Sequence, residues 1–137
     1  SADVLHPFSQ SRNAAVYLAG HGLADQRIAV DGCIAGPMLC AYLGKKIYYL
    51  DIDQEGSYLT WKRSWFPFQR RTIQDEMNGA SLIKDWKSFI LVSNRKVQTD
   101  SIPCRNGPDY YRLSPVAAFD NSIVAWEVYY IYKVDRK

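Results

Sequence analysis

Residues that could bind a phosphate or a carboxylate lie in a loop with two glycines that follows a short β-rich run. The loop reads Asp31-Gly32-Cys33-Ile34-Ala35-Gly36-Pro37. Free backbone N–H groups and the positive end of a helix dipole at such a position suit a phosphate or a carboxylate. The spacing matches neither G-x-G-x-x-G nor the phosphate loop with its Lys-Ser/Thr pair, and turn geometry explains the glycines about as well. Asp31, Gly32 and Gly36 are candidate ligand-binding residues.

A second candidate surface mixes aromatic rings with cations. It reads Trp61-Lys62-Arg63-Ser64-Trp65-Phe66-Pro67-Phe68-Gln69-Arg70-Arg71. Aromatic faces bind sugar rings, stack on bases or lie at a membrane interface, and neighbouring cations favour phosphate in each case. Burial of Trp61 and its neighbours in the core, with the cations solvated, is an equal alternative. Trp61, Arg63 and Trp65 are the candidates for ligand contact here.

Other residue types that could do chemistry lack suitable partners in the sequence. The acidic run at residues 51–56 offers oxygen ligands for Mg²⁺ or Ca²⁺, but its spacing does not fit an EF-hand loop, and a solvated turn is favoured. The two histidines have no nucleophile near them in sequence. Cys33, Cys40 and Cys104 show neither C-x-x-C nor Cys/His zinc spacing. We therefore expect no catalytic residue, no metal and no cofactor.

The composition is typical of one globular domain over residues 1–137. Hydrophobic residues make up 47% and charged residues 23% of the chain, enough for one core. The net charge of +3 is too small for most nucleic-acid-binding surfaces, so we expect no nucleic-acid partner. The longest apolar run, residues 32–44, is too short to span about 30 Å of hydrocarbon. Because the sequence starts at Ser1 without an initiator Met or a signal segment, we expect a piece of a longer protein.

The first elements place the glycine loop at a strand end. An apolar face between a serine cap and Gly20 predicts a helix, and residues 27–31 predict a short strand. Pro37 and Gly44 are typical of the first turn and the stop of a second helix, and residues 46–50 form the next predicted strand. A strand, a helix and a strand in this order predict a right-handed parallel unit. The loop then lies at the carboxyl end of the first strand.

The remaining elements are a second full helix, the third helix predicted along the chain, and several strands. We expect a polar turn at residues 51–56 and a strand at residues 57–61. The Thr72–Asp75 segment has the form of a capping box for a helix, whose helically spaced apolar positions are Ile73, Met77, Ala80 and Ile83. The continuous apolar run at residues 89–92 is typical of a central strand.

The C-terminal part predicts antiparallel strands. Residues 103–108 are expected to form a loop, in which Cys104 is the most exposed thiol. Residues 123–134 alternate as a strand with one buried face, while Glu127 and Lys133 lie on a partly wet face. Few helix signals follow residue 85, which favours antiparallel pairing of the late strands. The predicted fold class is α/β, a single three-layer domain with a mixed sheet of about five to six strands flanked by helices, with a Rossmann-like start and antiparallel C-terminal strands.

Several segments resemble one family of membrane proteins. The segments are Pro7-Phe8-Ser9-Gln10-Ser11 followed by Ala14-Ala15-Val16-Tyr17-Leu18, Ala41-Tyr42-Leu43-Gly44 with Ile47-Tyr48-Tyr49, Gly56-Ser57-Tyr58-Leu59-Thr60-Trp61, and the Glu127 to Tyr132 strand. In this order they are similar to the C-terminal domain of bacterial polytopic membrane proteins described as glycosyltransferase-like, of the GT-C type related to protein mannosyltransferases. Residues 31–35 and 62–63 depart from the acid-rich versions of this pattern.

The resemblance implies a location and an accessory role. It implies the extracytoplasmic (periplasmic) face of a bacterial cytoplasmic membrane, with the membrane part of the same polypeptide as partner. It also implies a lipid-linked sugar or a glycan acceptor as ligand. Because the family's catalytic acid is expected in an early loop between membrane spans, residues 1–137 alone are expected to catalyse no glycosyl transfer. The alternatives are a free-standing phosphate- or nucleotide-binding module or enzyme that uses the Gly32–Gly36 loop, and a nucleic-acid binder through residues 61–71.

Overall fold

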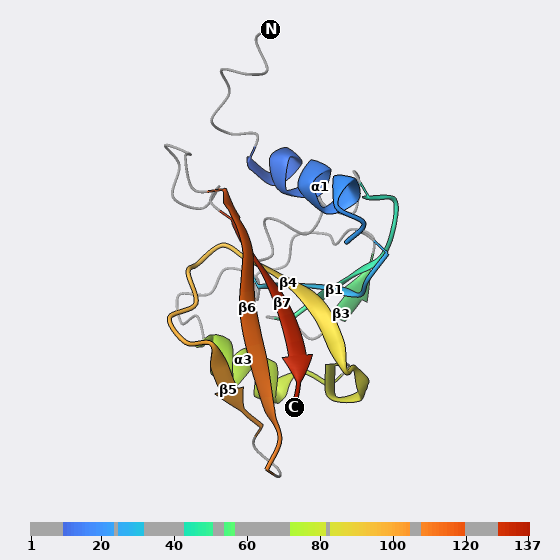
Figure 1. Cartoon of the computed structure of the whole chain (residues 1–137). Coiled ribbons are helices and arrows are strands. Elements are labelled where there is room, and N and C mark those ends of the chain that lie inside the picture. Colours follow the sequence, from blue (N-terminus) through green and yellow to red (C-terminus); the bar gives the residue numbers. More distant parts are fainter. Residues whose placement is uncertain are drawn as a thin grey trace, which may run out of the picture.

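Seven strands form one mixed sheet in the part of the chain that the computed structural model describes, which is residues 10–23, 25–31, 43–50, 54–56, 72–81, 83–104, 108–119 and 129–137. The strands are β1 (Ile28–Asp31), β2 (Ile47–Tyr49), β3 (Gln54–Gly56), β4 (Ser88–Ser93), β5 (Ser101–Pro103), β6 (Tyr110–Phe119) and β7 (Tyr129–Arg136). Their order across the sheet is β3-β2-β1-β4-β7-β6-β5. The helices are α1 (Gln10–Gly20), α3 (Ile73–Gly79) and the short 3-10 helix η4 (Ile83–Asp85) (Figure 1).

The centre of the sheet is parallel and fully buried. Strand β1 pairs in parallel with β2 on one side and with β4 on the other. All four residues of β1 are buried, as expected for a strand covered on both faces. Strands β4, β7, β6 and β5 then pair antiparallel in that order, and β3 pairs antiparallel with β2. The predicted parallel start and antiparallel C-terminal strands are confirmed, with seven strands among the described residues instead of five to six.

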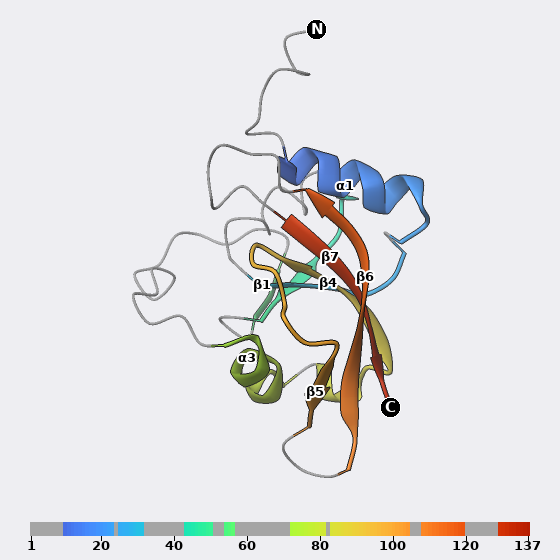
Figure 2. The same ribbon diagram turned by 60° about the vertical axis from the view of Figure 1, so that its left-hand side comes forward.

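Helix α1 covers one face of the sheet. Its Ala14, Ala15 and Leu18 are buried against residues of the sheet such as Val30 and Ile131. Two of the three buried side chains are alanines, so the helix axis can lie close to the strands. The helix ends at Gly20, as predicted from the sequence. Figure 2 shows α1 and α3 on opposite sides of the sheet.

Helix α3 covers the other face and begins at the predicted cap. The Asp75 N–H donates to Thr72 Oγ1 at 3.1 Å, which satisfies one of the open N–H groups of the first turn. Ile73 and Met77 are buried in the core on this face. The helix ends at Gly79, and Ile83 lies in η4. One periodic apolar pattern therefore belongs to two short helices.

Trp86, just after η4, closes the core on the α3 face. Its ring makes edge-on contacts with Tyr48 and Phe89, at centroid distances of 5.7 and 5.6 Å. The Arg27 guanidinium lies over the same indole at 5.1 Å from the ring centroid. These contacts join the amino ends of β1, β2 and β4 to the segment that contains η4.

Two sequence-based expectations are wrong in the edge strands β3 and β5, and sequence reasoning misses the inner strand β6. Residues 54–56 form β3 instead of a polar turn, because pairing with β2 supplies the backbone partners that their side chains do not signal. Pro103 belongs to β5 instead of a loop. Strand β6 was not predicted; its Pro115 is tolerated because the register with β7 shifts between Pro115 and Ala117.

The last strand is confirmed from Tyr129 onward; on its second face Lys133 is half-buried, as expected, whereas two residues there are fully buried. Tyr132 and Val134 pack on the α3 face, as the alternation predicts. Tyr129 and Ile131 are equally buried under α1, so the expected partly wet face is wrong for this part of the strand. The predicted helix at residues 37–44 and the predicted strand at residues 57–61 lie outside the described residues, apart from the end of that helix. There Gly44 has φ +65°, as a helix stop requires.

Candidate functional site

Asp31 is the last residue of β1 and has no exposed surface. Side chains alternate along a strand, and Ala29 packs on the α3 face, so Asp31 is directed to that same face. A buried carboxylate requires strong hydrogen-bond partners or a counter-ion. Asp31 therefore places a buried carboxylate at the carboxyl end of a parallel strand.

Two residues from the end of β4 bind Asp31. Parallel pairing puts Ser93 in register with Asp31, and Ser93 Oγ donates to Asp31 Oδ2 at 2.8 Å. Arg95 Nε donates to the same oxygen at 2.7 Å, and Arg95 Nη2 lies 3.3 Å from Asp31 Oδ1. The guanidinium thus holds the carboxylate by both oxygens, the strongest common geometry for such a pair.

The same guanidinium reaches a second buried carboxylate, on α3. Arg95 Nη2 donates to Glu76 Oε2 at 3.2 Å, and the Glu76 side chain is only 2% exposed. Arg95 itself is 28% exposed. We call Asp31, Glu76, Ser93 and Arg95 the carboxyl-edge cluster. It joins β1, β4 and α3, and Arg95 is its most accessible member.

The loop after β4 is held in place by hydrogen bonds of its own. The Asn94 N–H donates to the Asp31 carbonyl at 3.2 Å, and the Arg95 N–H donates to Ser93 Oγ at 3.2 Å. The Val97 N–H donates to Tyr132 Oη at 2.9 Å. Burial raises the pKa of the Tyr132 phenol, partly offset by this bond from Val97. The Tyr132 hydroxyl therefore stays neutral at physiological pH. The hydrogen bonds of Asn94 and Val97 hold the loop on both sides of Arg95.

Asn94 has a buried oxygen whose hydrogen bonding is incomplete. Among the described residues, no donor reaches its Oδ1, although the atom is buried. Buried polar atoms without a partner are uncommon in folded proteins and call for an explanation, such as a bound molecule. This atom belongs to the residue between Ser93 and Arg95, at the end of β4.

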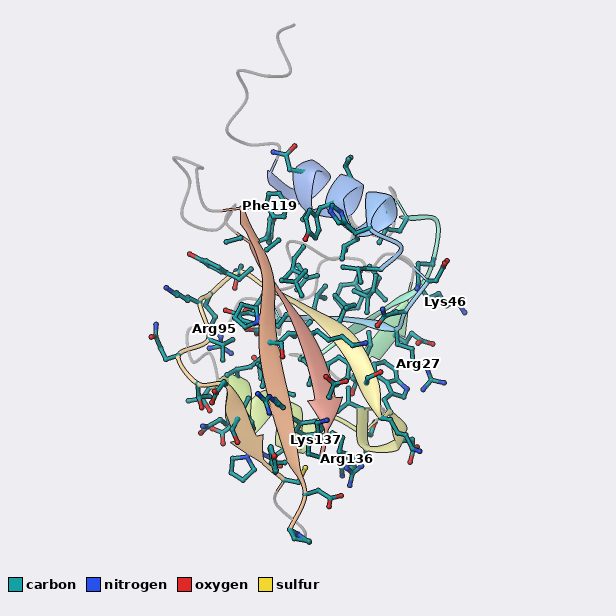
Figure 3. All side chains as sticks on the ribbon, viewed as in Figure 1. Arg27, Lys46, Arg95, Phe119, Arg136 and Lys137 are labelled. Carbon is teal, nitrogen blue, oxygen red and sulfur yellow. The ribbon has the colours of Figure 1, made fainter. Side chains whose placement is uncertain are left out.

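The cluster lies where the chain connections diverge. Strand β1 leads to β2 on one side of the sheet, whereas β4 leads to β5, β6 and β7 on the other. In α/β sheets, ligands bind outside the carboxyl ends of the strands at such a point. The predicted Gly32–Gly36 loop follows Asp31 directly in the sequence and lies outside the described residues. Figure 3 shows Arg95 at the end of the molecule away from Arg27, which precedes β1.

No protein-family model, no curated protein and no solved structure matches this chain. Within the described ranges, no three His, Cys, Asp or Glu side chains are grouped so that they could hold a metal ion. Over the same ranges, no helix combines the length and the hydrophobicity needed to cross a bilayer.

The structure places one of the six predicted site residues. Asp31 lies in the carboxyl-edge cluster, whereas Gly32, Gly36, Trp61, Arg63 and Trp65 lie outside the described residues. Sequence reasoning missed Glu76, Ser93 and Arg95. Glu76 had a usable signal, because it occupies a position on the apolar face of α3, between Ile73 and Met77. A charged residue on such a face is seldom buried without a partner.

Proposed function

We propose that this chain is an accessory recognition domain of a glycosyltransferase-like integral membrane protein, on the extracytoplasmic face of the membrane. In this proposal it binds a hydroxyl-rich ligand, the sugar of a lipid-linked donor or of a glycan acceptor, at the carboxyl-edge cluster. The sequence resemblance supports the setting. The arrangement around Asn94 and Arg95 supports the place of binding. The same proposal includes a three-layer, Rossmann-like arrangement of the whole domain.

The single observation that carries the ligand class is the unpaired Asn94 Oδ1. This acceptor belongs to the residue that precedes Arg95, whose side chain is 28% exposed. A sugar hydroxyl both donates and accepts hydrogen bonds, so it can donate to an acceptor such as Asn94 Oδ1. A phosphate at neutral pH carries chiefly acceptor oxygens and would leave Asn94 Oδ1 unpaired.

The charges of the cluster favour the same class. The Asp31 and Glu76 carboxylates both pair with the Arg95 guanidinium. A neutral hydroxyl adds no charge to this buried group, whereas a phosphate would add negative charge next to two carboxylates. The alternative, a phosphate or nucleotide at the Gly32–Gly36 loop, has the loop sequence in its favour and this charge balance against it.

The residues take different roles in this proposal. Arg95 and Asn94 contact the ligand, and Asp31 and Glu76 position Arg95. The sequence-based candidates Trp61, Arg63 and Trp65 are assigned to ligand contact in this proposal. The isolated domain performs recognition only, and chemistry belongs to the membrane part of the parent protein.

Vesicle flotation tests this function. We expect the wild-type chain to float with phosphatidylcholine vesicles that contain a polyprenyl-phosphate hexose, because the hexose supplies the hydroxyls. Vesicles in which a phosphatidyl lipid supplies the same surface charge should recover less of the protein. Equal recovery on both vesicle types would show that charge alone, not the sugar, holds the domain to the surface, and would refute the proposal.

A further inference from the structure

A cavity of about 480 Å³ lies between η4 and the end of β7, and most of its charged side chains are cationic. The cations are Lys84, Lys87, Arg136 and Lys137. Two carboxylates, Asp85 and Asp109, also line it. We call this the basic cavity. In Figure 3, Arg136 and Lys137 lie side by side at the lower end of the molecule.

Arg136 is held rigidly at this cavity. Its Nε donates to Asp109 Oδ2 at 3.2 Å, and its Nη1 donates to the Lys84 carbonyl. Its backbone N–H donates to the Lys87 carbonyl at 2.8 Å. A guanidinium held by two side-chain hydrogen bonds on a fixed backbone loses little conformational entropy when it binds an anion.

Lys137 is fixed through its backbone. Its N–H donates to the Tyr110 carbonyl at 2.8 Å, and the Tyr110 N–H donates to the Lys137 carbonyl at 3.2 Å. Lys84 and Lys87 come from the opposite side, in η4 and just after it, and both are exposed. The cations therefore approach the cavity from two separate segments of the chain.

The charge balance of the cavity selects an anion. The four cationic side chains exceed the two carboxylates, and one of those carboxylates, Asp109, is already paired with Arg136. The volume is in the range of small-ligand sites. Lysines act as point charges for phosphate oxygens, and an arginine fork can bind two of them at once.

We propose that the basic cavity is a phosphate-binding site, for a phosphomonoester either free in solution or in a lipid headgroup. Register places it at the opposite end of β4 from the carboxyl-edge cluster, because Ser88 pairs with Asp135 whereas Ser93 pairs with Tyr130. Phosphate binding here is therefore independent of the sugar recognition proposed for the other edge. Each site can fail its test without affecting the other.

A ¹⁵N-detected NMR titration of the wild-type chain with inorganic phosphate tests the site. We expect saturable shifts of the Arg136 Nε–H and of the Lys137 backbone amide. The double variant Lys84→Gln with Lys87→Gln should bind about tenfold more weakly, because it removes two of the four cations that line the cavity. Both residues are exposed, so the fold does not depend on them. Lys46→Gln with Lys96→Gln removes the same charge from exposed positions that do not line the cavity, and should leave the affinity unchanged.

A vesicle arm distinguishes the two sources of phosphate. Binding to phosphatidic acid vesicles that is lost in the Lys84/Lys87 variant but kept in the Lys46/Lys96 variant assigns the cavity to a lipid headgroup. Saturable binding of inorganic phosphate without vesicle binding assigns it to a soluble phosphate. If neither probe binds saturably, or if both double variants lose binding equally, the attraction is only that of net charge and the proposed site does not exist.

Discussion

We expect Arg95→Met to lower the free energy of unfolding by about 3 kcal/mol, because it removes the cation shared by two buried carboxylates. Asp31 has no exposed surface and the Glu76 side chain is 2% exposed, so water cannot replace the guanidinium without local opening. Urea denaturation followed by circular dichroism measures the change. A loss below about 1 kcal/mol would show that Arg95 contributes no more to stability than an exposed surface ion pair does.

Two further variants show whether this loss comes from the carboxylates. Lys96→Met changes an exposed neighbour in the same loop and should alter the stability by less than about 0.5 kcal/mol. Adding Asp31→Asn to Arg95→Met removes one of the two carboxylates that lose their ion pair with Arg95, so the double variant should be more stable than Arg95→Met alone. An additive loss in the double variant would contradict the direct pairing of Arg95 with Asp31.

The second large effect is expected from Leu18→Ala in α1, which should cost about 3 kcal/mol. Leu18 is the largest buried side chain that the helix places on the sheet, and its neighbours Ala14 and Ala15 cannot fill the space it leaves. Thermal unfolding should show a lower Tm, and urea denaturation a lower midpoint.

Val16 provides the matched control on the same helix. It is 58% exposed, so Val16→Ala removes little buried surface and should change the stability by less than about 0.5 kcal/mol. Similar losses for the two variants would mean that helix propensity, not packing on the sheet, holds α1. The packing described for this face would then be wrong.

Sequence reasoning predicts best the elements whose pattern is strong and local. The run at residues 89–92 is buried on both faces in β4, and the Thr72 cap begins α3 as expected. Helix α1 ends at Gly20 because the apolar face ends there. In each case the signal needs only neighbouring residues, such as a cap, a stop or a periodic face.

Strands β3 and β6 escape prediction for different reasons. Strand β3 has the sequence Gln-Glu-Gly and forms at the sheet edge because β2 offers backbone partners that its side chains do not signal. Strand β6 contains Pro115, which is unfavourable inside a strand, and it forms because β5 and β7 pair with it on either side. Residues in these strands contribute to the fold through backbone pairing with neighbouring strands.

The candidate site likewise combines one residue that local sequence singles out with others that only the fold brings to it. Asp31 can be singled out because it ends a short apolar strand before a glycine loop. Its partner Arg95 is 64 residues away in sequence, and only the parallel pairing of β1 with β4 brings the two together. Glu76 comes from a helix on the α3 face of the sheet. A network built from three elements requires the fold before it can be recognised.

The most direct test of the central claim is an NMR titration of the wild-type chain with neutral methyl hexosides, which present sugar hydroxyls without phosphate or lipid. We predict saturable shifts of the Asn94 side-chain amide and the Arg95 Nε–H. The Arg95 shift should be lost in Asn94→Ala, and both shifts should be kept in Gln98→Ala, which removes an exposed amide from the same loop. Absence of saturable shifts with every hexoside, or shifts confined to residues outside the carboxyl ends of β1 and β4, would contradict sugar recognition at this edge.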